Sequence, residues 1–147
     1  MLTTTQKISA LVKNGYPVNP SQLVNLVDKE WGHEEWIANT NAYCGKKLVF
    51  KAGYQCSMHQ HKIKDETFYI QSGTVVLDTE YQEKIERRIM QSGDTMHILP
   101  FMWHRITALT PAEVLEFSTF HMDEDSYRKS TSGKADLKAM GLGECNL

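Results

Sequence analysis

Short runs rich in β-branched and aromatic residues recur from Trp36 to about Phe120, and each run is bounded by glycine, proline, aspartate or serine. Such runs are typical of β-strands, and Ser72-Gly73 is one of the clearest turns between them. Many short strands at regular spacing predict an all-β sandwich or barrel. The expected strands are Glu35–Asn39, Lys46–Lys51, Cys56–His61, Thr67–Gln71, Thr74–Thr79, Lys84–Met90, Thr95–Leu99, Trp103–Ala108 and Glu113–Phe120.

Two short helices are predicted ahead of these strands. Thr4 or Thr5 can cap the first, which ends near Gly15 and has apolar residues at helical spacing at Ile8, Leu11 and Val12. The second begins at Asn19-Pro20, an N-cap followed by the proline favoured in the first turn, and its apolar residues are Leu23, Leu26 and Val27. Neither helix is long enough to be a domain, so we expect both to pack against the strands.

Composition narrows the class of protein. With 147 residues, 41% of them hydrophobic, the chain can bury the core of one domain. Lysine and arginine number 16 and aspartate and glutamate 18, a near-balance that argues against nucleic acid or an anionic membrane as the main partner. No apolar run approaches the roughly 20 residues that span a bilayer, and the N-terminus has no apolar stretch of the kind found in secretory signals. Three cysteines without a paired short spacing fit a reducing compartment, so we expect a cytoplasmic protein.

Candidate chemistry is concentrated in one segment, where His59 and His61 are followed by Glu66. Side chains two residues apart on a strand share a face, so the two imidazoles can converge on one ion. Glu66 follows a short loop and can return a carboxylate to the same place, and His104 offers a further imidazole. Three imidazoles and one carboxylate suit Mn, Fe, Co, Ni or Zn, and they leave open positions for substrate or water. A surface or cross-strand histidine pair is the alternative interpretation.

The spacing of Gly53, His59, His61, Glu66 and Gly73 closely resembles the first motif of the cupin superfamily, G-x5-H-x-H-x4-E-x6-G. The second motif, G-x5-P-x-G-x2-H-x3-N, is matched at Gly93 and His104, whereas its proline, glycine and asparagine positions hold Leu99, Phe101 and Ala108. The resemblance implies a double-stranded β-helix, a jelly-roll barrel, with His59, His61, Glu66 and His104 as ligands of one divalent transition metal per chain. We therefore expect a helical extension over residues 1–30, a cupin barrel over 31–122 and a capping segment or tail over 123–147.

A narrower resemblance covers roughly Trp31 to Tyr127. Four runs look like the cupin domain of type II phosphomannose isomerases and like stand-alone sugar-isomerase-like cupins: Trp31–Trp36, Lys46–Leu48, Ser57–His61 and Phe68–Thr74. This resemblance implies the interconversion of an aldose and a ketose, with or without a phosphate group, at a divalent metal. The implied partner is a small sugar or sugar phosphate.

Such an isomerisation needs a group that moves a proton between neighbouring carbons. Glu116 is the first candidate, because an inward carboxylate in an apolar strand would be desolvated and its proton affinity raised. Lys46 is the second candidate, and only one of Lys46 and Lys47 can face the interior of the barrel. His97 is a weaker candidate for the same role. Nothing in the sequence places His33 or His121 near the site, so both are left out.

Two other functions stay open. The same donor set supports a mononuclear iron or nickel oxygenase, and a non-catalytic cupin could bind a sugar or another metabolite without turnover. The edge strands of the sheets and the apolar side chains of the segments before Glu35 would be exposed in a single chain. We therefore expect a second copy of the chain to bury them in a homodimer.

Overall fold

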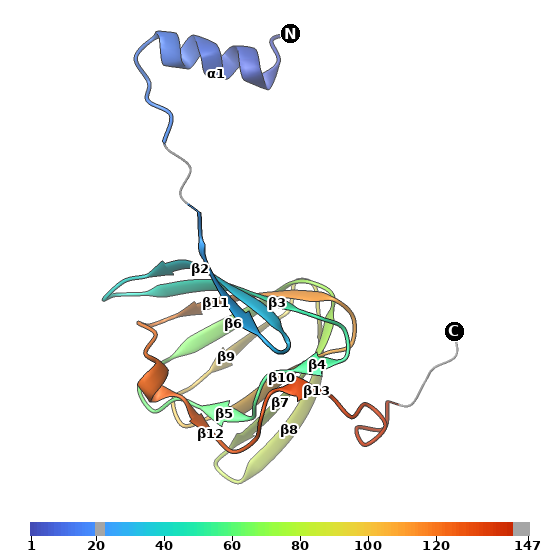
Figure 1. The fold of residues 1–147 in the computed structure, drawn as a ribbon. Coiled ribbons are helices and arrows are strands. Elements are labelled where there is room, and N and C mark those ends of the chain that lie inside the picture. The colour runs from blue at the N-terminus through green and yellow to red at the C-terminus, as the bar shows by residue number, and fades with distance from the viewer. Residues whose placement is uncertain (20–22, 143–147) are drawn as a thin grey trace.

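The computed structural model describes residues 1–19 and 23–142, and within them the chain forms two antiparallel β-sheets that face each other (Figure 1). One sheet has six strands in the order β1-β2-β3-β11-β6-β9, and the other has seven, including the hairpin β7-β8. This arrangement confirms the all-β expectation. The elements are α1 (Thr4–Lys13), β1 (Asn25–Lys29), β2 (Gly32–Asn39), β3 (Cys44–Phe50), β4 (Tyr54–Gln55), β5 (His59–Gln60), β6 (Glu66–Ser72), β7 (Thr74–Tyr81), β8 (Lys84–Gln91), β9 (Thr95–Ile98), β10 (Trp103–Ala108), β11 (Ala112–Ser118), the short 3-10 helix η1 (Asp123–Asp125), β12 (Tyr127–Arg128) and β13 (Gly133–Lys134).

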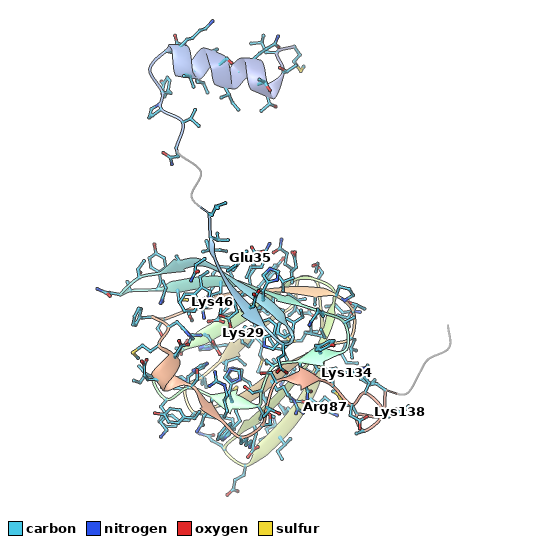
Figure 2. All side chains as sticks on the ribbon, viewed as in Figure 1. Lys29, Glu35, Lys46, Arg87, Lys134 and Lys138 are labelled. Carbon is cyan, nitrogen blue, oxygen red and sulfur yellow. The ribbon has the colours of Figure 1, made fainter. Side chains whose placement is uncertain are left out.

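The core lies between the two sheets, where side chains fill the interior of the barrel (Figure 2). Alternate residues of each strand point inward, because successive side chains of a strand leave opposite faces. Along β3 this alternation buries Lys46 together with Leu48 and Phe50, and along β11 it buries Glu116 together with Val114. The same pleat that builds the apolar core therefore brings a lysine and a glutamate into the barrel.

The expected second helix is wrong over the residues that the structure describes. Leu26 and Val27 belong to β1, which pairs with β2 in an antiparallel hairpin, while the proposed start at Pro20 lies outside the described residues. The turn of this hairpin is anchored by Trp31, which is buried and stacks on Phe50 with ring centroids 4.2 Å apart. Because this contact joins residues far apart in the sequence, local apolar spacing does not reveal it.

The first helix forms, but it begins one residue earlier than predicted and does not pack on the barrel. Its cap is Thr3, whose side chain accepts a hydrogen bond from the Gln6 N–H while the Gln6 side chain accepts one from the Thr3 N–H. None of its residues is buried, and Figure 1 shows it apart from both sheets. Across the described part of the chain, every helix is too short or too polar to cross a membrane.

The strand predicted over Cys56–His61 is interrupted. Only Tyr54–Gln55 and His59–Gln60 form ladders, and both pair with β10 on one side. On the other side they pair with β13 and β12, two short strands near the C-terminus that the sequence pattern did not predict. The segment that carries two of the candidate histidines is thus held by residues from distant parts of the chain.

The two expected motifs differ in the type of residue that occupies the left-handed turn position. Gly53 and Gly73 have φ of +79° and +83°, so the first motif has glycine where a left-handed backbone is needed. In the second motif Phe101 occupies the usual glycine position and still adopts φ of +66°. The turn before His104 therefore keeps the shape that glycine would favour, at the cost of backbone strain.

Candidate metal centre

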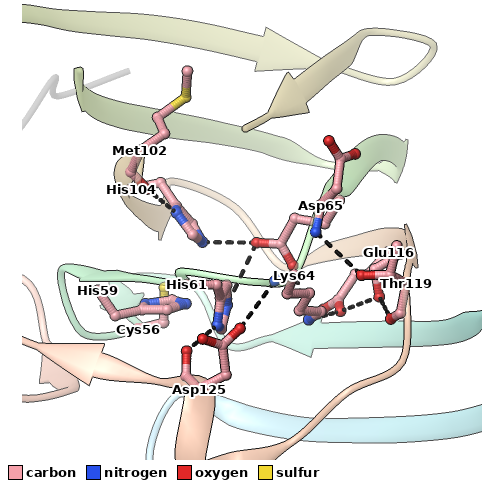
Figure 3. Close-up of polar contacts among 12 residues, drawn as sticks. Cys56, His59, His61, Lys64, Asp65, Met102, His104, Glu116, Thr119 and Asp125 are labelled. Carbon is pink, nitrogen blue, oxygen red and sulfur yellow. Dashed lines mark hydrogen bonds and ion pairs between the residues drawn. The ribbon is translucent and has the colours of Figure 1, made fainter. Parts of the chain in front are cut away.

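Three histidines converge inside the barrel. His59 in β5 lies directly opposite His104 in β10, and His61 follows two residues after His59. One nitrogen from each ring can be chosen so that all three lie within 4.8 Å of one another. The imidazoles come from two neighbouring strands, and Figure 3 shows them facing one another.

The protonation of the three rings is set by backbone carbonyls. The Nδ1 atoms of His59, His61 and His104 lie 2.8, 2.8 and 3.0 Å from the carbonyl oxygens of Ser57, Asp125 and Met102, respectively. A carbonyl oxygen only accepts a hydrogen bond, so each Nδ1 carries the proton. In a neutral ring each Nε2 is then left with a lone pair, which is how proteins orient histidine ligands of metals.

Glu66 adds a carboxylate oxygen beside the imidazole nitrogens. Its Oε1 lies 2.9 Å from Nε2 of His104 and 3.7 Å from Nε2 of His61. Both Glu66 Oε1 and His104 Nε2 are buried, and neither has a hydrogen-bond partner among the described residues. If His104 Nε2 carried a proton, it could donate a hydrogen bond to Glu66 Oε1. The Nε2 atoms of His59 and His61 would still point toward the same place with no hydrogen-bond donor. A divalent cation would satisfy the three converging imidazole nitrogens, with Glu66 Oε1 beside two of them, so the donor set fits a transition metal.

Burial keeps two of the histidines neutral. It lowers the pKa of His59 well below the ordinary value, and the neighbouring His104 ring adds to the effect. Burial also lowers the pKa of His61 to about 4, although Glu66 acts in the opposite direction. Because metals bind the neutral imidazole, both side chains are ready to act as ligands near neutral pH.

Lys64 is a buried cation beside this group, and it was missed as a site residue. Its Nζ lies 2.9 Å from Glu66 Oε2 and also donates a hydrogen bond to Glu116 Oε1 (Figure 3). Burial acts to lower the pKa of Lys64, but the two carboxylates outweigh it and raise the pKa. Burial likewise acts to raise the pKa of Glu66, yet Lys64 and the facing imidazoles hold it well below its usual range. Lys64 therefore occupies Oε2 of Glu66 and leaves Oε1 to the histidines.

Both predicted catalytic residues point into the barrel. Glu116 is 5% exposed, accepts the hydrogen bond from Lys64 and also accepts one from the Ser118 hydroxyl at 3.3 Å. Lys46, opposite Glu116 in the register of β3 and β11, is 2% exposed. Its Nζ lies 3.2 Å from Glu34 Oε2 and 4.1 Å from the ring centre of Trp36.

The remaining candidates lie elsewhere. Lys47 faces the outer side of the sheet, where its Nζ is 3.1 Å from Glu35 Oε2. His97 is also outside, where it is exposed and its Nε2 lies 2.8 Å from Asp65 Oδ1, so this weaker candidate is not part of the site. His33 pairs with Glu35 rather than with the site, as the sequence indicated.

Nothing in the sequence gives a reason to place His121 at the site, but the structure places it there. It lines the same cavity as the three converging histidines, and its Nε2 lies 3.1 Å from Asp123 Oδ1. Two backbone hydrogen bonds with the Asn39 side chain bring it there: Asn39 Nδ2 donates to the His121 carbonyl, and the His121 N–H donates to Asn39 Oδ1. These hydrogen bonds join residues 82 positions apart, so no local sequence pattern predicts them.

These groups line one cavity of about 100 Å³ between the two sheets. The converging imidazoles and Glu66 form one part of its wall, and Lys64, Glu116, Lys46 and Glu34 form a charged part. The aromatic rings of Trp31, Phe50 and Phe68 close a third side. The cavity can therefore hold a small polar molecule against a metal, with paired acidic and basic groups beside it.

Comparison with known proteins identifies the architecture. Residues 47–118 match the family model of the cupin domain. No curated protein sequence matches the chain. Many solved structures resemble it, including the following three. For KdgF from Halomonas sp., the identity is 21% and the TM-score 0.61, over 71% of this chain and 98% of that one. For the capsular polysaccharide assembling protein CapF from Staphylococcus aureus, the identity is 17% and the TM-score 0.66, over 76% of this chain and 35% of that one.

Oxalate decarboxylase from Bacillus subtilis is the third, at 15% identity and a TM-score of 0.66, over 77% of this chain and 33% of that one. The chain thus spans about a third of CapF and of this decarboxylase. At these identities the likeness establishes the fold, and it confirms the predicted jelly-roll barrel.

Proposed function

Because residues 47–118 form a cupin domain, we propose that this chain is a metal-dependent isomerase that interconverts an aldose and a ketose of a small sugar or sugar phosphate. One divalent transition metal per chain, Zn, Mn, Fe, Co or Ni, is held by His59, His61, Glu66 and His104. Glu116 and Lys46 are the side chains that act on the substrate, and Lys64 acts together with Glu116.

One observation carries this proposal: a buried acid and base pair lines the same cavity as the three converging imidazoles and Glu66. Lys64 and Glu116 are both withdrawn from solvent and are hydrogen-bonded to each other. The stability of a barrel does not require a buried ion pair, because well-packed apolar residues in its place are often as stable or more stable. Placing such a pair at the substrate is what proton transfer requires.

When bound, the metal ion would supply Lewis-acid polarisation of the substrate carbonyl. Glu116 removes a proton from the carbon beside that carbonyl and returns it to the former carbonyl carbon, while the proton of the adjacent hydroxyl group passes to the former carbonyl oxygen. Lys64 donates a hydrogen bond to this carboxylate inside the barrel and so fixes its orientation toward the cavity. Its ammonium can also donate a hydrogen bond to a substrate oxygen that gains negative charge.

Lys46 has a different part in this proposal. Its ammonium is fixed between the Glu34 carboxylate and the face of Trp36, so it offers a hydrogen-bond donor in a set direction. A sugar hydroxyl or carbonyl oxygen is a suitable acceptor for it. The aromatic wall made by Trp31, Phe50 and Phe68 keeps water away from the reacting carbons.

The direct test is a screen of aldoses, ketoses and their phosphates with the purified protein loaded in turn with each of the five metals. An isomerase gives the isomeric sugar, and with Glu116 as the base, solvent deuterium enters the product at the transferred carbon. Oxygen consumption that depends on iron would instead identify an oxygenase, and saturable binding without turnover would identify a binding protein.

The metal site is tested separately by replacing His59 and His61 together with alanine. The ligands line a cavity beside the apolar core rather than forming that core, so the double variant should fold and lose its metal. Metal analysis and circular dichroism measure the two properties. Full occupancy in the double variant would refute the assignment of these ligands.

We also propose that the protein is a cytoplasmic homodimer. The edge strand β1 and the apolar residues Ile8, Leu11 and Val12 of α1 are uncovered in the single chain. Cys44 and Cys56 form no disulfide among the described residues, which fits a reducing compartment. Light scattering at high micromolar concentration should give the mass of two chains, and a monomer there would refute the dimer.

A further inference from the structure

The strand segment that carries His59 and His61 has little sheet structure of its own. Its ladders are only two residues long, β4 at Tyr54–Gln55 and β5 at His59–Gln60. One side of this segment is bonded to β10, and the other side is covered by residues 121–135, which we name the C-terminal strap. The strap lies beyond residues 47–118, which match the cupin domain.

The strap is bonded to the histidine segment along its whole length. Tyr127 and Arg128 pair with Gln60 and His59 at one end, and the Ala135 N–H donates to the Gly53 carbonyl at 2.8 Å at the other. Between these points the segment is held at Met58, whose N–H donates to Ser130 Oγ at 2.7 Å and whose carbonyl accepts from the Lys129 N–H at 3.0 Å.

Asp125 makes the contacts of the strap that come nearest to the metal ligands. Its carboxylate accepts the N–H groups of three consecutive residues, Lys62, Ile63 and Lys64, at 2.9 to 3.2 Å. Its carbonyl oxygen accepts the Nδ1–H of His61 at 2.8 Å. The side chain is 4% exposed, so these bonds are shielded from water (Figure 3).

We propose that Asp125 is a positioning residue for the metal centre, and that docking of the C-terminal strap is thermodynamically coupled to metal binding. Its carboxylate fixes the loop that joins His61 to Glu66, and its carbonyl selects the tautomer and the ring orientation of His61. One residue thus sets two ligands relative to each other. The inference rests on the metal site of the proposed function, but not on the isomerase reaction.

Coupling follows from this geometry. If strap docking raises the affinity for the metal by some factor, then the metal stabilises the docked strap by the same factor. Loss of a group that orients a metal-binding histidine commonly weakens metal affinity 10- to 100-fold. We therefore expect the Asp125→Ala and Asp125→Asn variants to lose affinity for the metal alone by a factor of this order.

The experiment measures dissociation constants for Co²⁺ and Zn²⁺ by competition with a chelating dye, together with the thermal midpoint of each metal-free protein. Glu124→Gln is the matched charge control, because Glu124 lies on the same short helix, is exposed and makes no polar contact among the described residues. Asp94→Ala is the matched stability control: the Asp94 carboxylate also accepts a backbone N–H, that of Gln91 at 2.8 Å, but near the start of β9, away from Glu66.

Both controls should bind metal within twofold of the wild type, even where Asp94→Ala lowers the thermal midpoint. The Co²⁺ absorption spectrum of the Asp125 variants should also change, because without the carboxylate the N–H groups of residues 62–64 lose their acceptor, and the strap, with the backbone carbonyl of residue 125 that faces His61 Nδ1, is held less firmly. A folded Asp125→Ala protein with wild-type affinity and spectrum would overturn the inference while leaving the metal site intact. A wild type that binds neither metal would instead refute the metal site itself.

A second measurement uses the wild type, so it does not depend on the folding of a variant. Hydrogen exchange of the Lys62, Ile63 and Lys64 amides should slow on metal loading, because their acceptor is the Asp125 carboxylate of the strap. The amides of α1, which lies apart from both sheets and has no buried residue, should be unchanged. Equal protection of the three amides with and without metal would contradict the coupling.

Discussion

The ammonium of Lys64 lies 2.9 Å from the Glu66 carboxylate, although both side chains are almost completely removed from solvent. The same ammonium also binds Glu116, so one cation is shared by a proposed metal ligand and a proposed base. This shared contact connects the two functions of the cavity. Any change at Lys64 is therefore expected to affect the stability of the barrel as well as its chemistry.

We predict that Lys64→Met strongly destabilises the metal-free protein. The substitution leaves two buried carboxylates without their common partner, and removing one member of a buried ion pair typically costs about 3–5 kcal/mol. Urea unfolding at pH 7 measures the loss. The control is Lys62→Met, because Lys62 is exposed and its ammonium only lies over the Tyr127 ring. Equal stability of the two variants would show that the buried pair contributes nothing.

Three of the four metal-ligand candidates could be proposed from a local sequence pattern, and His104 only from its spacing after Gly93. His59, His61 and Glu66 stand at fixed offsets on one short segment, and the period of a strand turns these offsets into a shared direction. Glu116 was proposed because it is a carboxylate in an otherwise apolar strand. The pattern did not decide between an inward and an outward Glu116, and the register with β3 and β6 does.

Lys64, Asp125 and His121 could not be recognised in the same way. Lys64 meets Glu116 across 52 positions and Asp125 meets the Lys64 N–H across 61, so the contacts that define their roles are absent from any short window. By local pattern, Lys64 belongs to a polar loop and Asp125 to a solvated acidic run. The burial of charged residues is set by tertiary pairing, which hydrophobic periodicity does not encode.

Asp78 gives a prediction for the dependence of stability on pH. It is 5% exposed and receives hydrogen bonds from Arg87 Nε at 2.6 Å and from Arg105 at 2.9 Å. Burial acts to raise the pKa of Asp78, but the two guanidinium groups outweigh it and hold the pKa below the ordinary value. The folded protein therefore binds this proton less readily than the unfolded chain. The stabilisation is complete above the unfolded pKa of about 4 and is lost as the pH falls through the lower folded value.

The corresponding variant is Asp78→Asn, which removes the charge and keeps the shape. At pH 7 it should lower the free energy of unfolding by about 1 kcal/mol, a modest value because Arg87 is half exposed. The difference from the wild type should shrink between pH 4 and pH 2 in urea titrations. A difference that stays constant over this range would show that Asp78 does not act through its charge.

Phe101 stands at φ of +66°, where a residue with a Cβ is strained by about 1–2 kcal/mol. Its N–H donates to the His61 carbonyl at 2.7 Å, which explains why the conformation is kept. We predict that Phe101→Gly raises the free energy of unfolding by about 1 kcal/mol, because the exposed ring contributes little packing. Phe101→Ala removes the ring without relieving the backbone and should give no such gain. If the two variants have the same stability, the strain is not located at this residue.

Glu116→Gln is the decisive variant for the isomerase. The amide keeps the shape of the side chain and can still accept the hydrogen bond from Lys64, but it cannot take up a proton from a substrate carbon. Turnover should therefore fall by roughly 10²–10⁴, the usual contribution of a general base, with metal content and sugar affinity nearly unchanged. Glu113→Gln is the control, because Glu113 lies on the same strand but faces the outer side beside Lys47. Turnover is measured with the sugar that the screen identifies, in H₂O and in D₂O. Undiminished turnover in Glu116→Gln, or a wild-type product without solvent deuterium, would point to a hydride shift between the carbons, in which Glu116 has no part as the base.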